Sequence, residues 1–134
     1  MHAVKVELGE RSYDILIGAR LEDLGNHMDA LRLGRKAAVV TNARVSGLYG
    51  GRVLASLTAS GFRTMAVEVP DGEQAKSLEW ANAVYTALLI NGFDRRSPLV
   101  ALGGGVVGDL TGFAAATYMR GVPFVQVPTT LLAM

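Results

Sequence analysis

A run of glycines lies late in the chain, directly after a short apolar stretch. The segment reads Leu99-Val-Ala-Leu-Gly-Gly-Gly-Val-Val-Gly-Asp109, which predicts a buried strand, a tight turn and the start of a helix. Residues without side chains let a ligand approach the backbone, and the N–H groups that open a helix attract negative charge. The turn is therefore a candidate cradle for a phosphate or pyrophosphate. A turn that only allows close packing of helix and sheet is the alternative. The candidate residues are Gly103, Gly104, Gly105, Val106, Val107, Gly108 and Asp109.

The glycine spacing matches a known fingerprint only in part. Gly103-x-Gly105-x-x-Gly108 has the GxGxxG form of dinucleotide-binding domains. In those domains an acidic residue about 20 positions later binds the ribose hydroxyls. Here that distance ends around Val125 to Pro128, where no acid occurs. The sequence therefore favours a nucleotide cradle of another kind.

A second polar segment, Asp71-Gly-Glu-Gln-Ala-Lys76, is expected between a strand and a helix. Its carboxylates can accept both hydroxyls of a ribose, and its lysine can reach a hydroxyl or a phosphate oxygen. Acidic residues ahead of a helix are also favoured by the helix dipole alone, so a solvated capping loop is the alternative. The candidate residues are Asp71, Gly72, Glu73, Gln74, Ala75 and Lys76.

Two further charges adjoin these segments. Asp109 is expected in the first turn of its helix, where the dipole stabilises a carboxylate whatever the function. Because it would repel a phosphate, a role on a ribose or on the nicotinamide end suits it better. Arg120 follows an apolar helical run, where it either pairs with the helix dipole or clamps a phosphate with its planar fork. Spacing alone favours the dipole.

The elements that position these residues alternate along the chain. The first 18 residues predict a β-hairpin with a turn at Gly9 to Arg11. Four strands are expected at residues 36–41, 65–69, from Leu99, and 124–127. Helices are expected at residues 21–31, 45–59, 77–91 and from the glycine turn through Met119. This order predicts an α/β fold, a Rossmann-like parallel sheet flanked by helices with an N-terminal β-hairpin.

Ligands of such sheets bind outside the carboxyl ends of the strands, where the strand order reverses. The candidate segments all directly follow strands, and they include Thr41-Asn42 and Thr129-Thr130. We therefore expect them to gather at one edge of the sheet.

Composition bounds the classes of function. A chain of 134 residues that is 50% hydrophobic is enough for one domain with a core. A net charge of +1 and only four Phe, four Tyr and one Trp argue against a nucleic-acid partner. There is no cysteine, and His2 and His27 stand apart, so no metal site is expected within the chain. Without an apolar leader the chain is expected to be cytoplasmic, and Asp109 among the glycines argues against a membrane span at residues 99–119.

The last residues, Pro128-Thr-Thr-Leu-Leu-Ala-Met134, predict a helix capped by Thr129 or Thr130. The chain stops after about one turn, too short to be stable alone. We expect the chain to be a fragment cut inside an element.

Four motifs in this order resemble the 3-dehydroquinate synthase family, and the resemblance covers the whole chain. They are Asp71 to Lys76, Gly103 to Asp109, Tyr118-Met-Arg-Gly121 and Val125 to Met134. The resemblance implies contacts to NAD by the first two motifs and by Asn42, Thr129 and Thr130. It also implies that Arg120 binds the phosphate of the substrate, within one chain or across a dimer interface.

The family converts 3-deoxy-D-arabino-heptulosonate 7-phosphate, a phosphorylated keto acid, to 3-dehydroquinate and phosphate in the shikimate pathway. NAD is reduced and regenerated within one turnover. The resemblance implies a homodimer and a C-terminal domain, absent from residues 1–134, in which a glutamate and two histidines bind zinc or cobalt. It implies that this chain is the NAD-binding half and is inactive alone. The alternatives are a polyol or iron-type alcohol dehydrogenase, a related sugar-phosphate cyclase, or a non-catalytic nucleotide-binding module.

Overall fold

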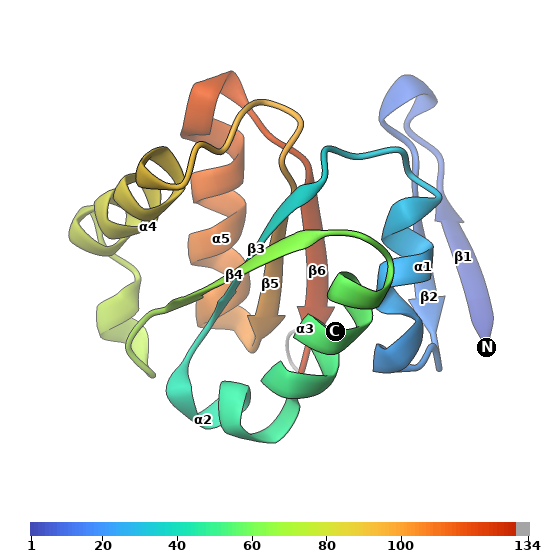
Figure 1. Cartoon of the computed structure of the whole chain (residues 1–134), viewed down its shortest axis with the longest axis horizontal. Helices are drawn as coiled ribbons and strands as arrows, with labels where there is room; N and C mark the ends of the chain where they lie inside the picture. The colour runs from blue at the N-terminus through green and yellow to red at the C-terminus, as the bar shows by residue number, and fades with distance from the viewer. Residues whose placement is uncertain (131–134) are drawn as a thin grey trace.

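The computed structural model describes residues 1–130 and contains a four-stranded parallel sheet (Figure 1). Its strands are β3 (Lys36–Thr41), β4 (Arg63–Glu68), β5 (Leu99–Gly103) and β6 (Phe124–Pro128), in the spatial order β4-β3-β5-β6. All three strand pairs are parallel. The helix expected after Thr129 or Thr130 falls mostly on residues 131–134, outside the described part of the chain.

The two middle strands are the most apolar ones. β5 is buried along its whole length, and β3 is buried from Ala37 to Thr41. The edge strands β4 and β6 contain only exposed and half-buried positions. Strands covered on both faces read as continuous apolar runs, so these sequence patterns determine which strands lie in the centre.

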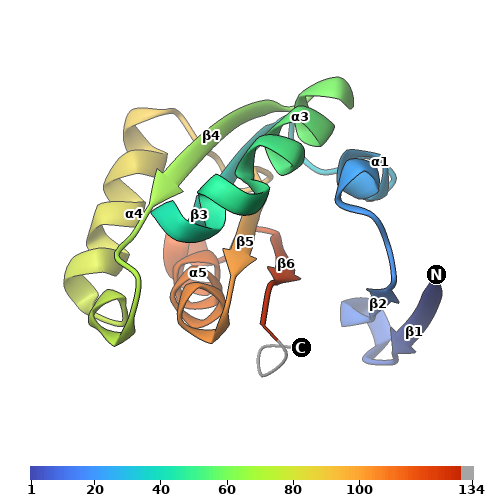
Figure 2. The ribbon, with the colours of Figure 1, turned by 90° about the horizontal axis from the view of Figure 1, so that it is seen from below.

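Helices cover both faces of this sheet (Figures 1 and 2). On one face lie α1 (Leu24–Asp29) and α3 (Gly51–Ala59), and on the other lie α4 (Leu78–Ile90) and α5 (Gly105–Thr117). Shorter turns complete the chain. They are η1 (Gly9–Arg11), η2 (Leu21–Asp23), α2 (Ala43–Val45), the π-helical η3 (Ser46–Gly50), η4 (Glu73–Ala75) and η5 (Tyr118–Arg120).

The core consists of one layer on each side of the sheet. Ala38, Val40, Leu99 and Ala101 pack against α4 and α5, where Leu88 and Ala114 are fully buried. The alternate residues Ala37, Val39, Val100 and Leu102 pack against α1 and α3, where Met28 and Leu57 are fully buried. Successive residues of a strand point to opposite faces, so one strand serves both layers.

The N-terminal strands β1 (His2–Val6) and β2 (Tyr13–Ile17) form a separate antiparallel hairpin. Figure 2 shows it apart from the four-stranded sheet. Val4 lies opposite Ile15, and both side chains are exposed. Tyr13 and Ile17, on the same face, are exposed as well.

The fold class expected from the sequence is confirmed, and the differences concern element ends. The helix expected at residues 45–59 begins at Ala43 and contains a π-helical turn. The helix expected at 21–31 is shorter, with a 3-10 turn before α1. The helix expected to continue through Met119 ends at Thr117, because Met119 and Arg120 have positive φ angles of 48° and 67°.

Candidate functional site

The carboxyl ends of the parallel strands bring the predicted segments together. β3, β4, β5 and β6 all end at the same edge of the sheet, and residues 41–42, 71–76, 103–109 and 129–130 follow them. Backbone hydrogen bonds connect neighbouring segments: Thr129 N donates to Gly103 O over 3.0 Å, and Val69 N donates to Thr41 O over 2.8 Å. The expected gathering at one edge is present.

The strand order reverses between β3 and β5. The chain leaves β3 for the face covered by α3, and it leaves the neighbouring β5 for the face covered by α5. In α/β sheets, ligands bind outside the carboxyl edge at a point where two neighbouring connections depart to opposite faces. Asn42, after β3, and Gly104, after β5, stand on either side of this point.

Asn42 is buried, with 6% of its surface exposed, and it caps α2. Its Oδ1 accepts a hydrogen bond of 2.9 Å from the backbone N–H of Val45. The residue therefore already has a structural role at the position where a contact to a ligand is expected.

The glycines of the turn serve different purposes. A Cβ atom at Gly103 would come within 2.9 Å of the Val107 side chain, and one at Gly108 would come within 2.8 Å of Nε2 of Gln126. Gly103 therefore lets α5 pack closely on the end of β5, whereas the amide of Gln126 is the flexible end of its side chain and can move aside at Gly108. A Cβ atom at Gly105 would meet nothing within 4 Å. Packing therefore does not require the glycine at 105, and the backbone there is open to an approaching ligand.

Gly104 joins the turn to the end of β6. It is the N-cap of α5, and its carbonyl accepts the first helical hydrogen bond, from Gly108 N over 3.0 Å. A Cβ atom at Gly104 would lie 3.1 Å from Cγ2 of Thr130. Thr129 and Thr130 thus flank the glycine turn, as the sequence predicts. The first N–H groups of a helix lack partners within it, so the start of α5 offers donors to an anion.

The segment from Asp71 to Lys76 lies beside the first turns of α5. Ala75 is completely buried and anchors the segment in the core with Val107 and Leu110. Asp71, Glu73 and Gln74 are exposed to solvent. Buried alanine and exposed polar groups are what a binding loop needs to be held in place while it faces a ligand.

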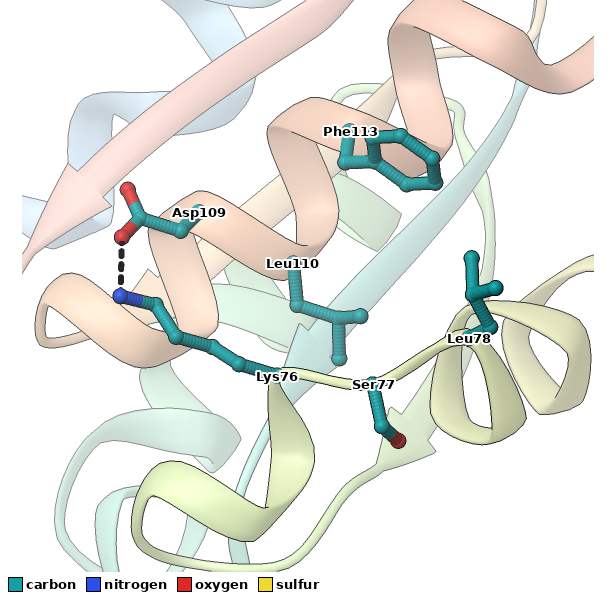
Figure 3. Close-up of a pocket in the computed structure, with 6 residues that line it drawn as sticks. All are labelled: Lys76, Ser77, Leu78, Asp109, Leu110 and Phe113. Atoms are coloured by element: carbon teal, nitrogen blue, oxygen red, sulfur yellow. Dashed lines mark ion pairs between the residues drawn. The ribbon is translucent and has the colours of Figure 1, made fainter.

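Lys76 forms an ion pair with Asp109 (Figure 3). Its Nζ atom lies 2.8 Å from Oδ2 of Asp109 and 3.9 Å from Oε2 of Glu73. The hydrogen bond and charge of Asp109, and then the charge of Glu73, raise the pKa of Lys76 above its ordinary value. The sequence analysis missed this pair, because no local pattern links positions so far apart.

Asp109 is not in the first turn of its helix, contrary to expectation. α5 begins at Gly105, so Asp109 is the fifth residue and starts the second turn. The first-turn dipole argument for a purely structural role therefore applies only weakly to it.

An open pocket of about 300 Å³ lies next to the ion pair. Its lining combines the charged pair and one serine with three apolar side chains (Figure 3). The lining residues are Lys76, Ser77, Leu78, Asp109, Leu110 and Phe113.

Arg120 lies at the opposite end of the sheet from the glycine turn. α5 has 13 residues and spans roughly 20 Å between the two positions. The chain then enters β6 at Phe124, which pairs with Leu99 at the start of β5. The structure therefore does not bring Arg120 together with the other predicted site residues of the same chain.

The turn that carries Arg120 is held in a strained conformation. Met119 and Arg120 both have left-handed backbone angles, which residues other than glycine rarely adopt. Tyr118, which sequence reasoning left without a role, anchors the turn: its hydroxyl donates to Phe93 O over 2.8 Å, and its ring stacks on Tyr85. Burial raises the pKa of Tyr118. Strain maintained by such anchoring is typical of functional positions.

Within residues 1–130 no three His, Cys, Asp or Glu side chains are grouped so that they could hold a metal ion. None of the helices in the same range is long and apolar enough to cross a membrane.

Known proteins are similar to this chain over the segments at this edge of the sheet. A family model described as 3-dehydroquinate synthase N-terminal matches residues 66–134, which include both candidate motifs. The 3-dehydroquinate synthase of Geobacter metallireducens is 55% identical over 134 residues, which make up 99% of this chain and 37% of that protein.

Two solved structures share the architecture. A 2-deoxy-scyllo-inosose synthase superposes with a TM-score of 0.87 at 22% identity, over 98% of this chain and 37% of that one, which shows the fold alone. The 2-epi-5-epi-valiolone synthase ValA of Streptomyces hygroscopicus subsp. jinggangensis, solved with NAD+ and Zn2+ bound, has a TM-score of 0.78 at 35% identity. That match covers 94% of this chain and 35% of ValA. The chain thus spans little more than a third of the proteins it matches.

Proposed function

Because this chain belongs to the 3-dehydroquinate synthase family, we propose that it forms the NAD-binding part of an enzyme that converts 3-deoxy-D-arabino-heptulosonate 7-phosphate to 3-dehydroquinate and phosphate. The observation that carries the proposal is the open backbone at Gly105, where α5 begins beside the reversal of strand order. A pyrophosphate can approach the first N–H groups of α5 there without meeting a side chain.

The residues around this position suit the rest of a dinucleotide. We assign the pyrophosphate to residues 103–108 with Thr129 and Thr130, and the ribose hydroxyls to the segment 71–76, with Asp109 toward the nicotinamide end. Asn42 follows β3, on the other side of the reversal of strand order, and would contact the ligand while capping α2. When bound, NAD supplies a reversible hydride acceptor for an alcohol of the substrate.

We propose that Arg120 binds the substrate phosphate in the site of a partner subunit. Its distance from the glycine turn of its own chain and its anchored, strained backbone support this role. Arginine suits phosphate because its planar guanidinium offers paired donors. The whole enzyme is then a homodimer.

The remaining parts of the reaction are assigned to the portion of the enzyme outside this chain. We propose that residues 1–134 are one NAD-binding domain, that a divalent metal, zinc or cobalt, is held beyond it, and that this chain alone is inactive. ValA, in which Zn2+ accompanies NAD+, supports a metal in the whole protein. The cytoplasmic location stays a prediction from the sequence. The matched family model is that of the synthase, which favours this function over that of a polyol or iron-type alcohol dehydrogenase.

Calorimetric titration of NAD into Gly105→Val tests the proposal. We expect the variant to lose NAD binding while circular dichroism stays native, because the new side chain enters space that no protein atom occupies. Gly51→Val is the matched control: Gly51 begins α3, and a Cβ atom there also meets nothing within 4 Å. Unchanged NAD affinity in Gly105→Val would contradict the proposed pyrophosphate site.

A further inference from the structure

A second open pocket lies at the amino ends of β3 and β4, at the edge of the sheet opposite the glycine turn. Its volume of about 340 Å³ falls in the range of small-molecule sites. β3 has six residues, so roughly 20 Å of strand separates this pocket from Asn42 and the candidate dinucleotide site. The lining residues are Gly34, Arg35, Lys36, Arg63, Gly92, Asp94 and Ser97.

Two cations of this lining lie side by side on neighbouring strands. Lys36 and Arg63 are the first residues of β3 and β4, and they are partners in the parallel pairing. Both side chains point to the face covered by α4 and α5, because Ala38 and Met65, two positions later, pack into that layer. Like charges held this close repel each other. The fold therefore keeps two positive charges together at a cost in free energy.

No carboxylate of the described residues is paired with these two cations. Neither Lys36 nor Arg63 takes part in an ion pair within residues 1–130. Arg35, the third cation of the lining, pairs with Asp29 over 2.9 Å. Asp94 is the single acidic residue of the lining, and its carboxylate accepts hydrogen bonds from its own loop. The surroundings of the pocket thus keep an excess of positive charge.

The dipole of a helix accounts for Lys36 but not for Arg63. Lys36 Nζ donates to Asn91 O over 2.9 Å and to Gly92 O over 3.2 Å, at the end of α4, where a cation is favoured. These two hydrogen bonds hold the ammonium in place and leave its third N–H for a ligand. Arg63 is exposed, and its side chain forms no hydrogen bond within the described part of the chain. Local structure therefore gives no reason for a charge at position 63.

We propose that this pocket binds a small dianion, either free phosphate or the phosphate group of a monoester, between Lys36 and Arg63. A dianion between two cations replaces their repulsion with two attractions. Lys36 supplies a point charge that is already fixed, and Arg63 supplies the paired donors of its planar guanidinium. The site lies at the other edge of the sheet from the dinucleotide site, so it does not depend on the proposed binding of NAD.

Titration with inorganic phosphate at constant ionic strength, followed by nuclear magnetic resonance, tests the proposal. We expect the amides of Gly92 and Ser97 to shift to saturation, and Arg63→Met and Lys36→Met each to weaken the affinity at least about tenfold. Arg11→Met is the matched control, because Arg11 is an exposed cation on the hairpin without an ion pair. It should leave the affinity unchanged. Equal affinities of the wild type and Arg63→Met would overturn the proposal.

Gly105→Val separates this site from the proposed pyrophosphate site. We expect the phosphate-induced shifts of Gly92 and Ser97 to persist in this variant, whether or not the wild type binds NAD. Loss of these shifts in Gly105→Val would place the bound phosphate at the start of α5 and overturn the proposal. Glycerol 3-phosphate distinguishes the two sources of the dianion: binding as tight as that of inorganic phosphate assigns the site to monoesters, and weaker binding assigns it to free phosphate.

Urea unfolding provides a readout that a purely structural arginine would not change. In buffer without phosphate, Arg63→Met should be at least as stable as the wild type, because the repulsion from Lys36 is gone. Millimolar phosphate should raise the unfolding midpoint of the wild type more than that of Arg63→Met, because a ligand of the native state stabilises it. Equal gains in the two proteins would contradict a site that includes Arg63.

Discussion

Arg120 has an exposed, charged side chain and a left-handed backbone conformation, which glycine would adopt more easily. Its φ angle of 67° follows 48° at Met119, and Gly121 continues with 117°. Tyr118 and the hydrogen bond from Val122 N to Ala115 O hold the turn on both sides. The protein therefore holds an arginine where glycine would adopt the same backbone at a lower cost in free energy.

Stability and function should respond in opposite directions at this residue. We expect Arg120→Gly to raise the free energy of unfolding by about 1 kcal/mol, because glycine has no Cβ atom to strain. Arg120→Ala keeps the Cβ atom and should not gain stability. Urea unfolding of both variants makes the comparison, and equal gains in the two would show that strain is not the cause. In the whole enzyme both variants should raise the KM for the phosphorylated substrate and leave NAD affinity unchanged.

Single residues of the site could be predicted where the signal was local. The glycine turn and the polar loop follow strands in the sequence, so their gathering at one edge needs only parallel strands. The ion pair between Lys76 and Asp109 depends on how α5 packs beside the loop, and no sequence spacing encodes that. The opposite placement of Arg120 follows from the length of α5, which the sequence did indicate.

Helix ends show the same division between local and tertiary causes. The helix expected at residues 77–91 is present as α4, whose start is capped by the Ser77 hydroxyl, which accepts from Trp80 N, and whose end is followed by Gly92. The end of α5 was predicted wrongly, because Met119 is a good helix former on its own. The hydroxyl of Tyr118 reaches Phe93 O, and this contact pulls the chain out of the helix.

The loop between α4 and β5 provides a pH-dependent contribution to stability. Hydrogen bonds from Arg96 N and from the Ser97 hydroxyl hold the pKa of Asp94 below its ordinary value of 3.8. A carboxyl whose pKa is lowered by folding stabilises the protein above its unfolded pKa, and this stabilisation is lost as pH falls through the folded pKa.

We therefore expect the free energy of unfolding of the wild type to fall as pH drops below about 4. Asp94→Asn should reduce that fall, because the amide oxygen still accepts hydrogen bonds and does not titrate in this range. Urea unfolding at a series of pH values measures the effect, with Asp14→Asn on the exposed hairpin as the control for losing one negative charge. The same acid dependence in Asp94→Asn and the wild type would contradict the assignment.

At the scale of the molecule, the chain contains one well-packed α/β unit and one hairpin of a different character. β3 and β5 are buried on both faces, whereas Val4, Tyr13, Ile15 and Ile17 of the hairpin expose apolar side chains. A two-stranded hairpin is at best marginally stable in water. The two parts should therefore open with very different free energies.

Amide hydrogen exchange of the isolated chain should separate them. We expect the hairpin amides to exchange at least about 100-fold faster than those of β3 and β5, because only the latter require disruption of the core. Samples at several protein concentrations provide the control, because protection that comes from association of chains depends on concentration. Protection of the hairpin equal to that of β5, independent of concentration, would show that this chain itself covers the apolar face.

The fold of the parallel sheet could be predicted from the sequence, whereas the position of the N-terminal hairpin could not. Alternating strand and helix patterns gave the sheet, and the four motifs gave the family, which the matched family model confirms. The position of the hairpin away from the sheet had no signal in the sequence, because its alternation predicts a strand pair and not what the pair packs against. The site residues assigned to NAD and Arg120 remain predictions until binding is measured.

The glycines of the turn should also differ in how freely they can be replaced during evolution. Gly103 is required by the Val107 side chain beside it, so a descendant that lost its ligand would still keep this glycine to fold. Gly105 has no such protein neighbour and would be free to drift to alanine or serine in that descendant. We therefore expect a related sequence that keeps the glycine aligned with Gly103 but not the one aligned with Gly105 to have kept the fold and lost the cofactor.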